Sequence, residues 1–329
     1  MNNPVKQAFP GRLTGHRLLI LGAGLVAFTA GALAALGGDA PGLATNALAF
    51  RASSDGGFEF DTGGLRGRLR AGGKSLGLTA VVHAPSGAPL DRSNGLFSHY
   101  RVFTRGKRYG GGAWDWPSTA RLLPNGAVAV RWPAVEGRPF ELSAVYQWRR
   151  ADTLDLTTTV TAQADLLGFE SFLASYFSEA FTNALVCARG DADSGGQPVF
   201  RPAVKSAGDW QMFTRDEDAR TFASDGRWKL EPNPVDWAMM PVLAKPLGLR
   251  RAPGTGMAVA LMALPGDCFA IATPHEGEGH YSMYLSLFGR DIKAGQSLQA
   301  RTRLVLLSGD VERAAVAAYE RFGSGRARP

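Results

Sequence analysis

The sequence predicts an all-β protein, an antiparallel β-supersandwich with one C-terminal helix, preceded by an apolar N-terminal helix. The 329 residues include 41 glycines and 19 prolines, which is typical of short strands joined by many turns. Runs rich in β-branched and alternating apolar residues recur between turn-forming residues over most of the chain. The sequence shows neither a strand–helix rhythm nor a Gly-rich phosphate loop, which argues against nucleotide-binding folds.

The N-terminal part predicts export. Residues 1–17 carry three basic and no acidic residues, and Leu18–Leu36 is an uncharged apolar run. That length matches the roughly 20 residues of a membrane-spanning helix, with residues 1–17 on the cytoplasmic side. A cleaved signal peptide is the alternative, because Ala32-Leu33-Ala34 and Ala47-Leu48-Ala49 fit a small-residue cleavage pattern. Either reading predicts a periplasmic or extracytoplasmic domain, membrane-anchored or secreted.

Residues 37–45 form a predicted linker, and the β domain is expected at 46–308. Gly, Pro, Asn and Asp turns separate its strands. The region from Asp191 to Pro253 is less regular and is predicted to form long loops. The predicted strands are Leu76–His83, Phe97–Thr104, Ala127–Trp132, Phe140–Trp148, Leu154–Ala162, Phe169–Phe177, Trp210–Thr214, Met257–Leu264, Cys268–Ala272, Tyr281–Phe288 and Leu298–Leu307.

Residues 309–329 are predicted to form a C-terminal helix and tail. Asp310 is suited to cap the helix, Glu312 suits its first turn, and Gly323 suits its end. Apolar residues recur on one face between these positions, so the helix is expected to pack at one edge of the sandwich.

Three segments resemble the framework of the galactose mutarotase-like superfamily: GLRGRLRAGGKSLGLTAVVHAPSGAPL, VYQWRRADTLDLTTTVTA and LFGRDIKAGQSLQARTRLVLL. The resemblance implies one β-supersandwich that binds carbohydrate in a groove on a concave sheet. Family aldose epimerases pair a catalytic His with a Glu in a Gln-x-Glu context, and that context is absent here. The superfamily also holds lyases, glycoside hydrolase domains and non-catalytic sugar binders, so the activity stays open.

The segment TPHEGEGHYSMYLSLFGR holds the densest cluster of titratable residues. His275, Glu276, Glu278, His280 and Tyr281 stand just before or at a strand-like run. Such a cluster is costly to bury and unnecessary for folding. Acid–base work on a sugar, metal binding and a structural polar turn are the alternatives. The glycine spacing leaves ligands unfixed, so we expect neither a metal nor another cofactor.

Three further features are candidates for sugar binding. Strand alternation predicts that His99 and Arg101 share one face, where they would bind a sugar hydroxyl or a uronate carboxylate; the alternative is a polar pair on the solvent face. Glu179 follows a predicted strand end and faces either a groove or solvent. A glycine-rich loop follows the predicted strand Phe97–Thr104 and holds four candidates for sugar binding: Tyr109, Trp114, Asp115 and Trp116. The alternative for the two tryptophans is that they close the end of the core.

The overall charge and the cysteines bear on nucleic-acid binding and on disulfide or zinc sites. The formal charge of +7 is spread diffusely, without a lysine-rich tract, so nucleic-acid binding is not predicted. Cys187 and Cys268 either pair or remain separate buried thiols, and two cysteines alone cannot build a structural four-ligand zinc site.

Three hypotheses follow: an exported carbohydrate-active enzyme (epimerase, lyase or glycoside hydrolase), a non-catalytic glycan-binding or envelope scaffold protein, and a β domain without a ligand. In the first, one of Glu179, Glu276 and Glu278 acts as the base, with His99 or His280 as its acid partner.

Overall fold

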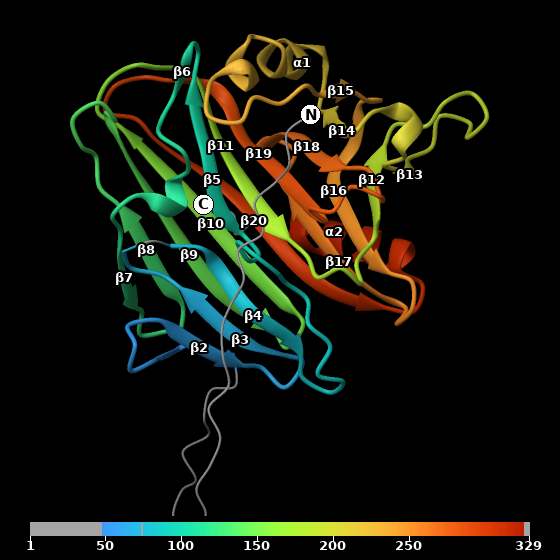
Figure 1. Cartoon of the computed structure of the whole chain (residues 1–329), viewed down its shortest axis with the longest axis horizontal. Coiled ribbons are helices and arrows are strands. Elements are labelled where there is room, and N and C mark those ends of the chain that lie inside the picture. The colour runs from blue at the N-terminus through green and yellow to red at the C-terminus, as the bar shows by residue number, and fades with distance from the viewer. Residues whose placement is uncertain (1–47, 74, 326–329) are drawn as a thin grey trace, which may run out of the picture. The chain divides into compact units, whose positions relative to one another are not determined.

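A computed structural model describes residues 48–73 and 75–325 (Figure 1). The predicted segments 1–17, 18–36 and 37–45 lie outside the described residues. Within the described part, no helix combines the length and the apolar character that a membrane crossing requires.

Strands dominate the described chain, as the sequence predicts, and they form three sheets. All strand pairs are antiparallel except one between β14 and β15. A small sheet holds β1 (Arg51–Ala52), β2 (Phe58–Asp61), β3 (Leu65–Arg70) and β4 (Gly77–His83). The nine-stranded sheet runs, in spatial order, β13 (Val199–Pro202), β12 (Asn183–Ala188), β16 (Leu243–Ala252), β17 (Met257–Ala263), β20 (Ser297–Ser308), β10 (Thr153–Ala162), β9 (Phe140–Arg150), β8 (Val128–Trp132) and β7 (Thr119–Leu122).

The seven-stranded sheet carries the candidate site. Its spatial order is β15 (Ala238–Met239), β14 (Trp210–Thr214), β18 (Cys268–Pro274), β19 (Ser282–Ile292), β11 (Leu166–Tyr176), β5 (Ser98–Thr104) and β6 (Lys107–Arg108). Two α-helices, α1 (Glu217–Ala223) and α2 (Val311–Ser324), and three 3-10 helices, η1 (Ala113–Asp115), η2 (Lys205–Ala207) and η3 (Arg227–Lys229), complete the described elements.

The main core lies between the two large sheets. Strand β9 alternates buried and half-buried residues from Phe140 to Trp148, so one face enters the core. Residues such as Phe169 and Leu173 of β11 join it from the seven-stranded sheet. The predicted hairpin is confirmed, because β9 and β10 pair antiparallel along their length, from Phe140 opposite Ala162 to Arg150 opposite Thr153 beside the turn.

Strands β11 and β19 are buried on their second face too. Phe172, Tyr176 and Tyr284 belong to a separate apolar cluster on the outer face of the seven-stranded sheet. Ala219 and Ala223 of helix α1, together with Trp228, join this cluster, so these segments cover part of the face. A sheet face that is only partly covered leaves room for a site between the strands and the covering segments.

Helix α2 packs on the nine-stranded sheet, where Ala315, Ala318 and Phe322 join Leu247 and Val305. The side chain of Asp310 accepts a hydrogen bond from the backbone N–H of Arg313, which is the predicted N-cap. The C-terminal helix is therefore confirmed, although it ends at Ser324 with Gly325 at its cap, beyond the predicted Gly323.

The prediction of long loops at 191–253 is wrong at four elements: β13, α1, β15 and β16. Strand β16 runs through Pro246, which lies where the pairing with β12 shifts register between Val186 and Ala188. A proline is tolerated at such an irregularity because no ladder hydrogen bond is needed there. Helix α1 begins after Asp216, whose side chain accepts from the Ala219 N–H at 2.7 Å. Asp216 is a capping signal that the surrounding charged residues obscure.

The two cysteines do not form a disulfide. Cys187 and Cys268 are both free thiols and both buried. Of the two alternatives that the sequence allowed, the structure has separate buried thiols.

Candidate functional site

A bulge in β5 places two neighbouring side chains on the outer face of the seven-stranded sheet. Val102 pairs with Ser171 and His99 with Leu173, so the two residues between them oppose the single residue Phe172. Such an insertion re-aims side chains beside it. Both inserted residues line a cavity on the outer face, whereas His99 points into the core. The expectation that His99 and Arg101 share one face is therefore wrong.

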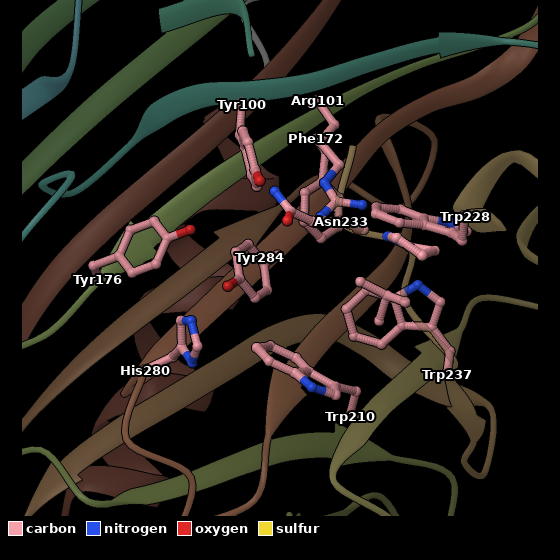
Figure 2. Close-up of a pocket in the computed structure, with 12 residues that line it drawn as sticks. Tyr100, Arg101, Phe172, Tyr176, Trp210, Trp228, Asn233, Trp237, His280 and Tyr284 are labelled. Carbon is pink, nitrogen blue, oxygen red and sulfur yellow. The ribbon is translucent and has the colours of Figure 1, made fainter. Parts of the chain in front are cut away.

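Two adjoining cavities form what we call the groove. The first cavity has a volume of about 380 Å³ (Figure 2). The second has a volume of about 550 Å³ and shares Tyr100, Tyr176 and His280 with the first. The first is lined by Tyr100, Arg101, Phe172, Tyr176, Trp210, Trp228, Asn233, Pro234, Val235, Trp237, His280 and Tyr284. The second adds Arg92, Ser93, Asn94, Trp114, Glu278 and Gly279.

The groove is walled by flat aromatic rings. Tyr100 and Trp114 stack with centroids 4.0 Å apart and planes 9° apart, and we call these two rings the platform. On the floor, Phe172 and Tyr284 stack at 4.6 Å and 17°. Gly112 makes the platform possible, because a Cβ there would lie 2.8 Å from the indole nitrogen of Trp114. Close approach thus requires glycine at that position.

A buried ion network holds the wall formed by residues 228–237. The Arg227 Nη1 donates to Glu170 Oε2 at 2.9 Å, and both side chains are fully buried. The same guanidinium donates to both carboxylate oxygens of Asp225, at 2.9 and 2.8 Å. Trp228 follows directly and packs edge-to-face on Phe172 of the floor, at 4.6 Å. The network therefore fixes where the wall meets the sheet.

Glu278 and His280 form a hydrogen-bonded pair at the junction of the two cavities. The distance from His280 Nδ1 to Glu278 Oε1 is 2.6 Å, and the His280 backbone N–H donates to Oε2 at 2.9 Å. A carboxylate in this position favours the tautomer with the proton on Nδ1, which leaves Nε2 as an acceptor. Such an imidazole is suited to taking or giving a proton.

Two phenols face the same space as His280 (Figure 2). Burial raises the pKa of Tyr176 to about 12, and burial raises the pKa of Tyr284 well above its usual value. The Ser282 hydroxyl donates to the Tyr284 oxygen at 2.7 Å. Both phenols therefore stay protonated at neutral pH and offer O–H donors to a ligand.

Four of the residues singled out by sequence come together in the groove: Arg101, Trp114, Glu278 and His280. His99 lies instead in the core, where its Nε2 is 2.9 Å from the Thr158 hydroxyl. Burial lowers the pKa of His99 to about 3, so its ring is neutral.

The aromatic and histidine candidates outside the groove have structural contacts. Tyr109 packs edge-to-face on Phe140 of the core at 4.9 Å. Trp116 is buried, and the guanidinium carbon of Arg138 lies 3.9 Å from its ring centroid. His275 is buried and its Nδ1 accepts from the Gly277 N–H. Tyr281 lies beneath the Arg92 guanidinium and is not among the residues lining either cavity.

Three acidic candidates lie on the surface. Asp115, Glu179 and Glu276 are exposed and line neither cavity. In the described residues, no three His, Cys, Asp or Glu side chains are grouped closely enough to hold a metal ion. The turn that carries His275 and His280 sends one imidazole inward and the other to the groove.

Most of the aromatic lining was missed from sequence, including Tyr100, Tyr176, Trp210, Trp228 and Trp237. One signal was present: two of the chain's seven tryptophans, Trp228 and Trp237, fall in the part of this region for which no strand is predicted. Tryptophans in a segment without strand periodicity indicate a packed or binding role that a loop prediction does not explain.

Comparisons with known proteins show a shared fold. No protein-family model matches the chain, and no curated protein matches it. Among solved structures, α-N-acetylgalactosaminidase NagBb from Bifidobacterium bifidum has a TM-score of 0.51 at 13% identity, over 82% of this chain and 39% of that one. A galactose mutarotase-like protein from Lactobacillus casei has a TM-score of 0.47 at 10% identity, over 77% of this chain and 100% of that one. A putative aldose 1-epimerase from Escherichia coli has a TM-score of 0.43 at 14% identity, over 75% and 97%. The similar structures thus include galactose mutarotase-like proteins, the superfamily that the three sequence segments resemble.

Proposed function

We propose that the protein binds a carbohydrate in the groove. The observation that carries this proposal is the concentration of flat rings, among them the platform, Trp210 and Trp237, around two connected cavities. Aromatic faces cover the apolar C–H face of a pyranose. The cavity volumes fall within the range of about 300–1,000 Å³ that is usual for small-molecule sites.

The polar groups of the groove suit sugar hydroxyls. Tyr176 and Tyr284 offer O–H donors, Glu278 offers carboxylate oxygens, and Asn94 offers both a donor and an acceptor. Polar groups beside aromatic walls orient a ligand that has one apolar and one polar face. The fold agrees with this ligand class, because NagBb, which has a similar fold, acts on an amino sugar according to its name.

The test is a glycan array with the full-length chain, followed by calorimetry on the glycans that bind. Trp210→Ala and Trp237→Ala should each weaken binding about 5- to 30-fold, which corresponds to roughly 1–2 kcal/mol for a truncated aromatic anchor. Leu122→Ala is the control for non-specific apolar binding, because Leu122 is 42% exposed on the nine-stranded sheet. If no glycan binds, or if all three variants bind alike, the proposal fails.

Catalysis is the second candidate, and the hydrogen-bonded pair of Glu278 and His280 favours it. The pair supplies one oriented base and the phenols supply acids, so one proton can be removed and another delivered, as an epimerisation or an elimination requires. Hydrolysis by two flanking carboxylates is less well supported, because Glu278 is the one acidic residue among the described residues that line the groove. Without turnover, the protein is a glycan-binding envelope protein.

Matched carboxamide variants test catalysis. Glu278→Gln should slow turnover of a bound glycan by roughly two to four orders of magnitude. Glu276→Gln removes the same charge from the same turn, yet Glu276 is exposed and outside the groove, so this variant should keep full activity. Equal rates in both variants would contradict the assignment.

We also propose that the domain acts outside the cytoplasm and is held there by the segment Leu18–Leu36. The uncharged apolar run with a basic flank supports this location. A C-terminally tagged chain should fractionate with membranes, and a protease added outside the inner membrane should degrade its β domain. A protected, cytoplasmic domain would contradict the proposal.

A further inference from the structure

The first cavity combines a buried cation with a complete lack of acidic lining. Its twelve lining residues include Arg101 and His280 but no aspartate or glutamate, as counted over the described residues. A neutral sugar needs hydroxyl partners of both kinds, and carboxylates are the usual acceptors. The acceptors of this cavity are neutral groups, and its permanent charge is the positive charge of Arg101.

Arg101 lacks the partners that a buried guanidinium normally has. Its side chain lies between the rings of Tyr100 and Trp228, with its guanidinium carbon 5.1 and 5.3 Å from their centroids, and the residue is 5% exposed. Nη2 donates to the backbone carbonyl of Asn233 at 2.9 Å, whereas Nε and Nη1 have no partner among the described residues. A buried charge without a counter-ion is costly.

The surroundings add positive charge rather than neutralise it. Arg108 donates to the carbonyls of Leu230 and Pro232, next to the carbonyl that Arg101 contacts. Burial, and then the charge of Arg101, lower the pKa of Arg108, so the two guanidinium groups repel each other. The negative charge of Glu231 favours the charged form of Arg108, but Glu231 is exposed to solvent and does not line the cavity. Glu278, at the far side of the groove, is already paired with His280.

The contact that now occupies Arg101 is replaceable. Asn233 is exposed and belongs to the wall, not to a strand. Asn233 lines the first cavity together with Arg101 (Figure 2), and its backbone carbonyl accepts from the guanidinium there. An oxyanion entering the cavity would take the place of this carbonyl and bind the guanidinium through charge-assisted hydrogen bonds, which are roughly twice as strong as neutral ones.

We propose that the groove selects an acidic glycan, whose carboxylate or sulfate group binds Arg101 while its sugar rings lie against the aromatic walls. This inference rests on the proposed function and narrows its ligand class. The planar fork of arginine matches both oxyanions, whereas a lysine would supply charge without the fork.

The experiment uses pairs of glycans that differ in one group. Oligogalacturonate and oligoglucuronate are each compared with the carboxyl-reduced oligosaccharide and with a sulfated form, by calorimetry on the full-length chain. The wild type should bind an anionic member about 10- to 100-fold more tightly than its neutral partner, as expected for a hydrogen bond to a charged group. The carboxylate and sulfate members show which of the two anions is preferred.

Arg101→Gln should abolish the preference for the anionic member and keep the affinity for the neutral one. Arg101→Lys, which retains the charge, is measured in parallel and should retain only part of the preference. Arg105→Gln removes a positive charge from an exposed position on the same hairpin, and it should leave the preference unchanged. Circular dichroism and thermal melting establish that each variant is folded.

The outcomes separate the two proposals. If the wild type binds both members of every pair equally, or if the preference survives in Arg101→Gln, the acidic-glycan inference is overturned while carbohydrate binding stands. If no glycan of any kind binds, the proposed function itself fails and the inference falls with it.

Discussion

Replacing His99 tests the position of this residue most sharply, because its burial ties the stability of the protein to pH. The ring lies against Trp132, at 5.0 Å between centroids, and burial lowers its pKa to about 3. In the unfolded chain the same imidazole takes up a proton near its ordinary value of 6.5. The unfolded state therefore binds more protons between these two values, and stability falls as the pH is lowered from about 6.5 to 3.

The size of the effect follows from that window. Each unit of difference between the folded and unfolded pKa is worth about 1.4 kcal/mol, so at pH 4 the wild type has lost roughly 3 kcal/mol through His99 alone. In His99→Gln this contribution is absent. The variant loses packing energy at pH 7, so its free energy of unfolding is lower than that of the wild type. This difference should shrink by roughly 3 kcal/mol between pH 7 and pH 4.

The assay is urea unfolding of both proteins at four pH values between 7 and 4, followed by tryptophan fluorescence and circular dichroism. Other carboxyl groups titrate in both proteins, so the difference between the two free energies of unfolding isolates His99. A difference that stays constant across this range would refute the reasoning. It would mean that the imidazole is not held neutral in the core.

Three further predictions concern the wall, the platform and the cysteines. Arg227→Met leaves the buried Glu170 without its partner and should lower the free energy of unfolding by about 3–5 kcal/mol in urea titrations; a loss below about 1 kcal/mol would rule out the network as the anchor of the wall. Gly112→Ala should separate the rings of the platform and weaken glycan binding about 5- to 10-fold by calorimetry, and unchanged affinity would show that the platform is not used. Burial raises the pKa of Cys187, and it raises that of Cys268 to about 12. Both thiols should therefore react with a disulfide reagent only after unfolding, and fewer than two reactive thiols in the denatured, unreduced chain would indicate a bond between them.

The fold was predictable because alternation leaves few choices for a strand. The run from Phe140 to Trp148 presents one apolar face, and a shift by one residue would send that face into solvent. Observed strand β9 accordingly begins at the predicted Phe140. The Asp310 cap and the apolar stripe behind it predicted α2 for the same kind of reason, since the signals are local.

The site was less predictable because its geometry depends on distant partners. The bulge that brings Tyr100 and Arg101 to one face exists only in the pairing of β5 with β11, about 70 residues further along the chain. The wall is positioned by Arg227 and Glu170, which are 57 residues apart in sequence. The TPHEGEGHYSMYLSLFGR segment was a correct place to look, yet sequence could not separate His280, which lines the groove, from His275, which turns inward.

Calorimetric titration of one glycan into Trp114→Ala and Trp116→Ala tests the central claim, carbohydrate binding in the groove, most directly. Trp114 lies in the platform, whereas Trp116 is buried outside the groove, two residues further on. We predict that Trp114→Ala loses affinity about 5- to 30-fold, while Trp116→Ala melts at a lower temperature but binds like the wild type. Equal affinity in Trp114→Ala and the wild type, or a loss confined to Trp116→Ala, would contradict a carbohydrate site in this groove.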